Sequence, residues 1–234
     1  MTRGLGVPIA VAMILLATIV AHSDPRHSAS AAKLADARVV VFPPSASVYE
    51  IVAGGQPVLR QEWSEAASGY VATAVAAALT AGRVTVVQYQ PPEVAERRAA
   101  HLQVTKVHAL VAQAINRHEY GGDKLRLPSM AGRFDWSVGP GAEVIRQDNG
   151  DADYALFVEF IEGHSSGGRV AMNVAAAVLG GRIVTGMQTG MASLVDLRTG
   201  DVVWFHRNRE SSGDLRTSDG ARKAIGALLQ ALPY

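Results

Sequence analysis

The sequence contains no cysteine, and this absence excludes several kinds of site. A chain without thiols forms no disulfide, holds no metal through thiolates and has no cysteine nucleophile. It also offers no cysteine to which a lipid could be attached after export. The composition therefore permits an oxidising compartment without requiring one, and it excludes a cysteine-anchored lipoprotein.

Excess charge of one sign is also nearly absent. The chain has 22 basic and 21 acidic residues, and without residues 1–23, which contain one arginine and no acid, the two numbers are equal. Nucleic acids and anionic lipids attract proteins with a basic surface. We therefore expect no nucleic-acid partner. A chain of 234 residues that is 48% hydrophobic is, in contrast, sufficient for one ordinary folded core.

The first residues have the pattern of an export signal. Arg3 is followed by an apolar run over residues 4–21, and polar residues begin directly afterwards. Ala21 and Ser23 are small residues at the two positions that a signal peptidase reads, which predicts cleavage after Ser23. The run is also about as long as the shortest membrane span. An uncleaved anchor that contacts the membrane through residues 4–21 therefore stays open as the alternative.

The whole chain divides into three parts. We interpret residues 1–23 as a signal peptide or uncleaved N-terminal anchor, and residues 24–37, which are small and polar, as a tether. Residues 38–234 form a single α/β domain. In both readings of the leader this domain is exported to the periplasm or cell envelope, and in the second it is tethered to the inner membrane.

Apolar runs and helical periodicity predict the elements of that domain. The expected strands are residues 38–42, 84–88 and 154–161, and residues 191–197 and 202–207 form a hairpin around Gly200. The expected helices are residues 64–81, 93–118 and 218–232. Residues 48–59 fit a hairpin or an irregular loop, residues 123–151 an irregular stretch, and residues 169–179 either a helix or extended segments.

Some details of these helices can be stated in advance. Ser64 is expected to cap the first helix and Gly82 to end it. The core-facing stripe of the second helix is expected to consist of Leu102, Val107, Val111, Ala114 and Ile115. The order of elements is β-α-β-α-β-hairpin-α, which is typical of an α/β (α+β) fold with a mixed sheet and helices packed on it.

One motif suggests catalysis. Residues 163–167 read Gly-His-Ser-Ser-Gly and fit the nucleophile elbow of serine hydrolases, with Ser165 as the nucleophile. Asp196 and His206 follow in the usual hydrolase order. However, these two residues lie on one short hairpin, whereas a triad draws its members from separate loops. Too few strands precede Ser165 for the usual hydrolase sheet. A glycine turn after a strand is the preferred interpretation, and a serine hydrolase is the alternative.

Metal and cofactor sites are not expected. His101 and His108 are seven residues apart on one helix, which separates them by about 10 Å along the axis, too far to hold one ion together. We interpret them as solvated or partly buried helix histidines. The glycines of residues 180–190 lack the lysine of a phosphate-binding loop. The sequence thus predicts no catalytic, cofactor-binding or metal-binding residues.

Four segments together resemble a known group of proteins. They are the opening strand Arg38–Pro44, the central strand Ala152–Val158, the hairpin Ala192–Phe205 and the amphipathic last helix. In this order they resemble the domain shared by the curli secretion-channel protein, the amino-terminal domain of TolB and the LpoB-type activators of peptidoglycan synthases. The resemblance implies an envelope module that binds proteins or assembles with itself and has no catalysis of its own.

The chain departs from this group in two ways. Many members carry a cysteine at the cleavage site, which is absent here. A pore of the curli type needs segments that alternate apolar with polar residues, whereas residues 170–179 have Asn173 as their one polar residue. We therefore predict a non-enzymatic envelope protein whose partners are other envelope proteins or further copies of itself. The apolar, glycine-rich segment Ser166–Gly190 is the predicted contact region. Full burial of residues 169–179 within the domain would contradict that prediction.

Overall fold

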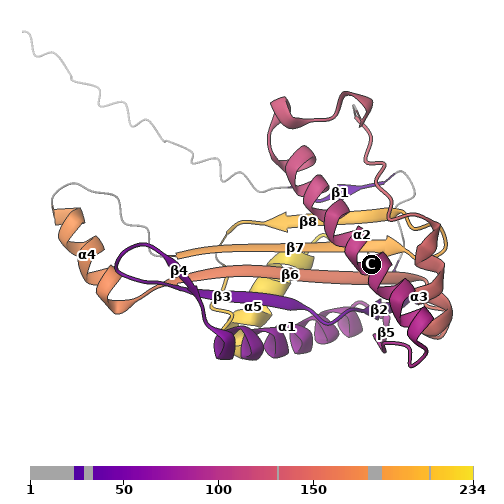
Figure 1. Ribbon diagram of the computed structural model, residues 1–234, viewed down its shortest axis with the longest axis horizontal. Coiled ribbons are helices and arrows are strands. Elements are labelled where there is room, and N and C mark those ends of the chain that lie inside the picture. Colours follow the sequence, from indigo (N-terminus) through magenta and orange to yellow (C-terminus); the bar gives the residue numbers. More distant parts are fainter. Residues whose placement is uncertain (1–23, 29–33, 131, 179–185, 211, 234) are drawn as a thin grey trace, which may run out of the picture.

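The computed structural model describes residues 24–28, 34–130, 132–178, 186–210 and 212–233. Within them, eight strands form one mixed sheet with helices packed on it (Figure 1). The strands are β1 (Arg26–His27), β2 (Arg38–Val41), β3 (Ser45–Ile51), β4 (Pro57–Leu59), β5 (Thr85–Gln88), β6 (Tyr154–Ser165), β7 (Gly186–Asp196) and β8 (Val202–Asn208). The helices are α1 (Gln61–Ala81), α2 (Ala95–Tyr120), α3 (Glu143–Asp148), α4 (Gly167–Val178) and α5 (Ser218–Leu229). Three short 3-10 turns lie between α2 and α3. The predicted α+β class is confirmed.

The long strand β6 organises the sheet. β7 pairs with it antiparallel along its whole length, and β8 continues beyond β7. On the other edge of β6, β2 and β3 follow one another, both parallel to it. The change from β2 to β3 comes at Pro43 and Pro44, where the missing N–H groups end the β2 ladder. The predicted hairpin at residues 198–201 is confirmed, with Gly200 at φ +80°.

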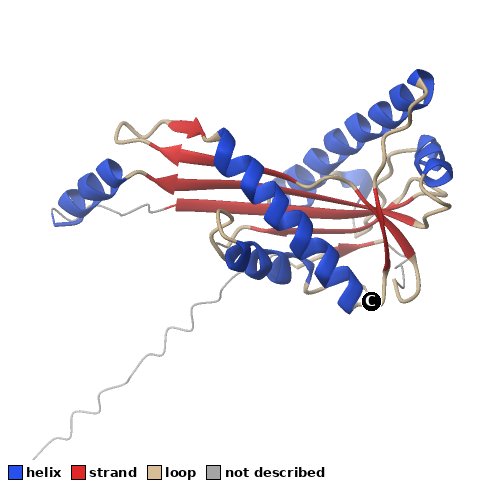
Figure 2. Ribbon diagram, turned by 90° about the horizontal axis from the view of Figure 1, so that it is seen from below, coloured by secondary structure: helices blue, strands red, loops and turns tan. Residues whose placement is uncertain are grey.

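One face of the sheet is covered by α1 and α5, which pack on each other and on the strands. Figure 2 views the molecule from below and shows the long α1 crossing in front of the strands. Alternate residues of β6 point into this layer, including Leu156, Val158 and Phe160. Trp204 of β8 is also fully buried there. The period-two pattern of the strands and the apolar stripes of the helices therefore meet in one core.

Of the described helices, those on the other face cover it at one end only. There α2 and α3 lie near the start of β6, at the right-hand end of the sheet in Figure 1. Ala155, Val195 and Phe205 form a second core with Val104 and Ile115 of α2. α3 lies inside the stretch that the sequence predicted to be irregular, and was missed because six residues carry little periodicity.

Two predicted helix details are wrong. α1 starts at Gln61, and Ser64 lies inside it, where its hydroxyl donates to the Arg60 carbonyl and accepts from the Val48 N–H. In the predicted stripe of α2, Ile115 is buried and Val107 and Val111 pack against the second core, but Leu102 is wrong. Leu102 is 53% exposed, while the neighbouring His101 is fully buried. Partners that lie far away in the sequence bury this histidine, so periodicity alone did not reveal it.

The segment predicted as a tether is partly attached to the domain. β1 pairs antiparallel with β8, and the Tyr120 hydroxyl donates to the Asp24 carbonyl. Leu34 is fully buried, and its N–H donates to the Pro233 carbonyl. The described parts of the predicted tether therefore contact the domain. The leader, residues 1–23, lies outside the described residues, and none of the helices that are described is long and apolar enough to span a membrane.

Candidate functional site

The structure separates the three residues of the hydrolase hypothesis. Ser165 ends β6, and α4 begins at Gly167, so the predicted strand–turn–helix context is present. Asp196, however, pairs with Tyr154 at the opposite end of β6. Eleven strand residues span about 36 Å. Asp196 therefore cannot act together with Ser165.

His206 is also remote from Ser165. Through Ala192, His206 is level with Val158 on β6, which is about 23 Å along the strand from Ser165. Its ring is buried against α5, where Nδ1 lies 2.7 Å from the Leu228 carbonyl oxygen. The Asp196–His206–Ser165 triad is therefore not assembled.

The two helix histidines have structural partners instead. His101 is fully buried between the Tyr89 hydroxyl, 3.1 Å from Nδ1, and the Asp148 carboxylate, 2.9 Å from Nε2. This contact ties α2 to α3. The Arg97 guanidinium, bonded to Asp148, lowers the pKa of that carboxyl. His101 is fully buried, so its interpretation as a solvated or partly buried residue is wrong. Its partner Asp148 is 47 positions away, so local spacing did not reveal this burial.

His108 lies seven residues after His101 on α2 and faces the sheet. Its Nε2 is 2.6 Å from the Ser193 hydroxyl, and its ring stacks on Phe157. His108, Ser193 and Phe157 line a mainly apolar pocket of 250 Å³ between α2 and the sheet. Burial lowers the pKa of His108 to about 4, so the ring is neutral at pH 7. A neutral, stacked histidine of this kind stabilises the fold.

The sheet face that α2 covers continues, beyond the part that α2 and α3 cover, into an apolar surface near the end of β6. We call this surface the distal strip. Strand register places Leu59, Tyr49 and Met187 in one row across β4, β3, β6 and β7, with Gly163 on β6 between them. The row is flanked by Ile51 and Ile161. Because Gly163 has no side chain, Ile51 and Met187 close over it: a Cβ there would lie 3.2 and 3.3 Å from them.

Much of the distal strip is in contact with solvent. Leu59, Ile161 and Met187 are 48%, 37% and 55% exposed, and Tyr49 and Ile51 are half-buried. Scattered exposed apolar residues are common, whereas a contiguous exposed group is typical of interaction surfaces. Neither Leu59 nor Tyr49 was singled out from the sequence. The alternation of β3 was the signal that could have found the latter.

α4 leaves the sheet directly beside this strip. It projects beyond the end of the sheet at the left of Figure 1. Its first turn rests on the β3–β4 hairpin, where the Arg169 guanidinium lies close to Gly55. Val170 is 43% exposed. The predicted contact region Ser166–Gly190 thus contains a helix whose described side chains are not fully buried, while residues 179–185 lie outside the described residues.

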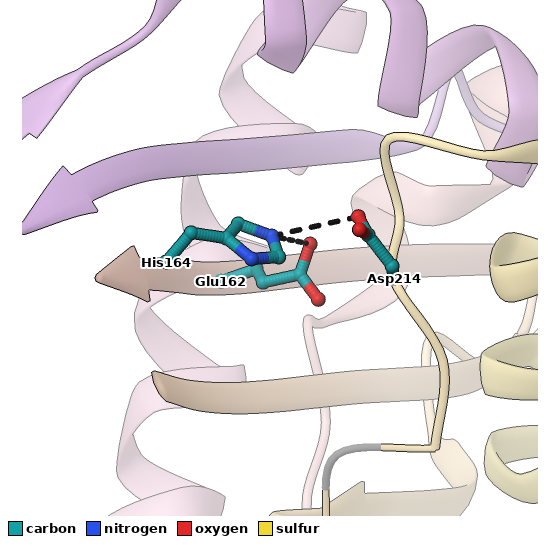
Figure 3. Close-up of side chains that lie close together, drawn as sticks. All are labelled: Glu162, His164 and Asp214. Carbon is teal, nitrogen blue, oxygen red and sulfur yellow. Dashed lines mark ion pairs between the residues drawn. The ribbon is translucent and has the colours of Figure 1, made fainter. Parts of the chain in front are cut away.

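A third feature lies on the α1 side of β6. Glu162 and His164 are two residues apart and point to the same face, and Asp214 approaches them from the loop before α5 (Figure 3). His164 Nε2 lies 2.9 Å from Glu162 Oε2 and 3.6 Å from Asp214 Oδ1. Among the described residues, these three have the geometry to hold a metal ion. Sequence analysis missed the cluster because Asp214 comes fifty positions later on an irregular loop.

The rim of this cluster contains one of the three tryptophans. The Trp63 ring meets the His164 ring edge-on at 6.3 Å, and the Arg216 guanidinium lies 5.0 Å from the Trp63 ring centre. Arg216 also donates to both oxygens of the Asp214 carboxylate and thereby lowers its pKa. The loop before α5 is thus fastened both to α1 and to the end of β6.

Comparison with solved structures gives three kinds of match. The LpoB C-terminal domain from Salmonella enterica is 13% identical, with 77% of this chain and 87% of that chain covered and a TM-score of 0.30. The PelC dodecamer from Paraburkholderia phytofirmans is 15% identical, with 90% and 96% covered and a TM-score of 0.37. Lipoprotein GNA1162 from Neisseria meningitidis is 15% identical, with 82% and 94% covered and a TM-score of 0.31.

The first of these matches is to a protein of the group that the sequence resembles. No protein-family model and no curated protein sequence matches the chain.

Proposed function

We propose that the chain is an exported, non-enzymatic module of the cell envelope that works by contact between proteins. The distal strip is the single observation that carries this proposal. It places large apolar side chains from four strands in one solvent-exposed surface, although α2 and α3 cover the other end of the same face. Export rests on the leader, residues 1–23, and is part of the proposal.

The first partner to test is a second copy of the chain. α4 is apolar in sequence, with Arg169 and Asn173 as its polar residues, and its first turn rests on the β3–β4 hairpin. A chain that carries an apolar helix beside an apolar strip offers two surfaces that another copy can cover. Full burial of one large apolar side chain contributes about 1.5–3 kcal/mol, while association itself costs at least about 4 kcal/mol. Several side chains must therefore be covered together.

The native mass of the full chain, purified from the envelope fraction with a C-terminal tag, tests this proposal. Light scattering over a concentration series should give a multiple of the chain mass. The double variant Ile161→Glu/Met187→Glu places two charges in the distal strip and should give a monomer. The matched control Leu110→Glu changes an equally apolar residue, 67% exposed on α2, and should keep the wild-type mass.

Two results would overturn self-association through this surface. One is a wild-type chain that stays monomeric at every concentration. The other is an oligomer that the double variant leaves intact. Circular dichroism of each variant shows whether the fold is retained, so that loss of the oligomer is not mistaken for unfolding.

A further inference from the structure

The cluster of Glu162, His164 and Asp214 has a second property besides proximity. The Nε2 atom of His164 is itself buried, faces both carboxylates and has no hydrogen bond of acceptable geometry to either. A buried ring nitrogen normally has a bonding partner. The orientation of this imidazole is therefore explained better by a ligand between the three side chains than by the pairs alone.

The spacing suits a small cation. The three ligand atoms all lie within 4.8 Å of one another. Zinc binds histidine nitrogen and carboxylate oxygen at about 2.0–2.2 Å in a tetrahedron, so two of its ligands lie about 3.4 Å apart. His164 Nε2 already lies 2.9 Å from Glu162 Oε2 and 3.6 Å from Asp214 Oδ1, and the Asp214 side chain is 38% exposed, so it has room to move towards such an ion.

Glu162 is held in place for such a role. Its side chain is 3% exposed, Oε1 accepts from the Gln188 amide at 2.7 Å, and Oε2 accepts from the Leu215 N–H at 3.1 Å. Gln188 also donates to the Gly213 carbonyl. Partners of this kind fix the orientation of a ligand before the metal arrives. A buried carboxylate also costs free energy unless a cation compensates its charge.

Arg216 competes with a metal ion for the Asp214 carboxylate. It neutralises Asp214 in the structure through two side-chain hydrogen bonds. A metal ion that takes Asp214 as a ligand must weaken this pair, while the guanidinium keeps its place against Trp63. The site therefore binds a metal more weakly than one without an internal cation.

We propose that Glu162, His164 and Asp214 bind one divalent transition-metal ion, with zinc as the ion to test first. One imidazole with two carboxylates favours zinc and its neighbours over magnesium or calcium, which prefer oxygen ligands alone. The ion would fasten the loop before α5 to the end of β6. This inference is independent of self-association, because the cluster lies on the opposite face of β6 from the distal strip.

Calorimetric titration of the chelator-treated full chain with zinc chloride is the test. We expect one ion per chain and a higher melting temperature in zinc, with no comparable effect of magnesium chloride. His164→Gln and Asp214→Asn should each weaken zinc binding by at least about tenfold. His118→Gln removes a histidine of α2 and should not change it, which controls for zinc bound by histidines elsewhere.

Arg216→Gln gives the most specific result. If Arg216 competes with the ion, its removal should tighten zinc binding, whereas a merely structural loop contact predicts no gain. Absence of zinc binding to the wild-type chain would overturn the proposal, as would binding that survives in both His164→Gln and Asp214→Asn. Circular dichroism of the metal-free variants confirms that each is folded.

Discussion

His108 shows how a single residue can make the fold sensitive to pH. Burial holds its pKa at about 4, whereas an exposed histidine has a pKa of 6.5. Between these values the unfolded chain takes up a proton that the folded chain does not. The free energy of unfolding therefore falls as the pH drops from 6.5 to 4, by about 3 kcal/mol at most.

The variant His108→Gln removes this titration. Urea unfolding at several pH values should show a smaller loss of stability between pH 6.5 and 4 than in the wild-type chain. At pH 7 the variant should be less stable, because the stacking on Phe157 is lost. Parallel stability curves for the two proteins across this range would show that His108 does not carry the effect.

Ser165 is predicted not to act as a nucleophile. Since Asp196 and His206 lie far along the sheet from it, no base is available from the predicted triad. We expect a fluorophosphonate probe to leave the wild-type chain unlabelled, as it does Ser165→Ala. Labelling that disappears in the variant would restore the hydrolase alternative.

The sequence predicted single residues less well than patterns. The partners of His101 and His108 are 47 and 85 positions away, so no local spacing revealed their burial. The cluster of Glu162, His164 and Asp214 depends on one irregular loop. In contrast, Gly200 was predicted correctly, since a tight hairpin constrains its own residue types.

At the scale of elements, Gly200 and Gly226 form a natural pair for mutation. Gly200 has φ +80°, and a Cβ there would lie 2.0 Å from the Gly139 carbonyl oxygen. Gly200→Ala should therefore destabilise the β7–β8 hairpin by roughly 1–3 kcal/mol or more. Gly226 lies in α5, where a Cβ would meet nothing within 4 Å, and Gly226→Ala should stabilise by about 0.5–1 kcal/mol. Thermal unfolding of both variants measures the two effects.

Equal stability of the two variants would contradict this account of the hairpin. It would mean that the chain between β7 and β8 can move away from Gly139 at little cost. The comparison is informative because both changes add the same single methyl group.

Most strands and helices were predicted because each has a pattern of its own. β2, β6 and the β7–β8 hairpin follow from apolar runs and turn residues, and α5 from its apolar stripe. The errors have two causes. The six residues of α3 carry little periodicity, whereas the start of α1 and the burial of His101 on α2 are decided by distant parts of the chain, which local periodicity does not report.

At the scale of the whole molecule, the order of elements gave the fold class but not the sheet order. The parallel pairing of both β2 and β3 with β6 requires the chain to turn at Pro43 and Pro44, and the sequence predicted the stop without the second pairing. The distal strip is a product of that pairing. It was therefore beyond the reach of the sequence alone.

Cleavage of the predicted leader can be tested on the full-length chain. Cells that express a C-terminally tagged version should yield a soluble envelope protein whose mass corresponds to a chain starting at Asp24. A full-length product in the membrane fraction would show instead that residues 4–21 are a retained anchor. Fractionation with mass determination distinguishes the two outcomes.

The pairing of β1 with β8 bears on the predicted cleavage after Ser23. β1 starts three residues after Ser23, the predicted last residue of the leader, and the Asp24 carbonyl is already bonded to Tyr120. A signal peptidase needs an extended, accessible substrate, whereas the folded domain draws the same stretch onto its own edge. If the leader is cleaved after Ser23 as predicted, cleavage and folding compete for these residues, and we expect a chain that folds before it is processed to keep its leader.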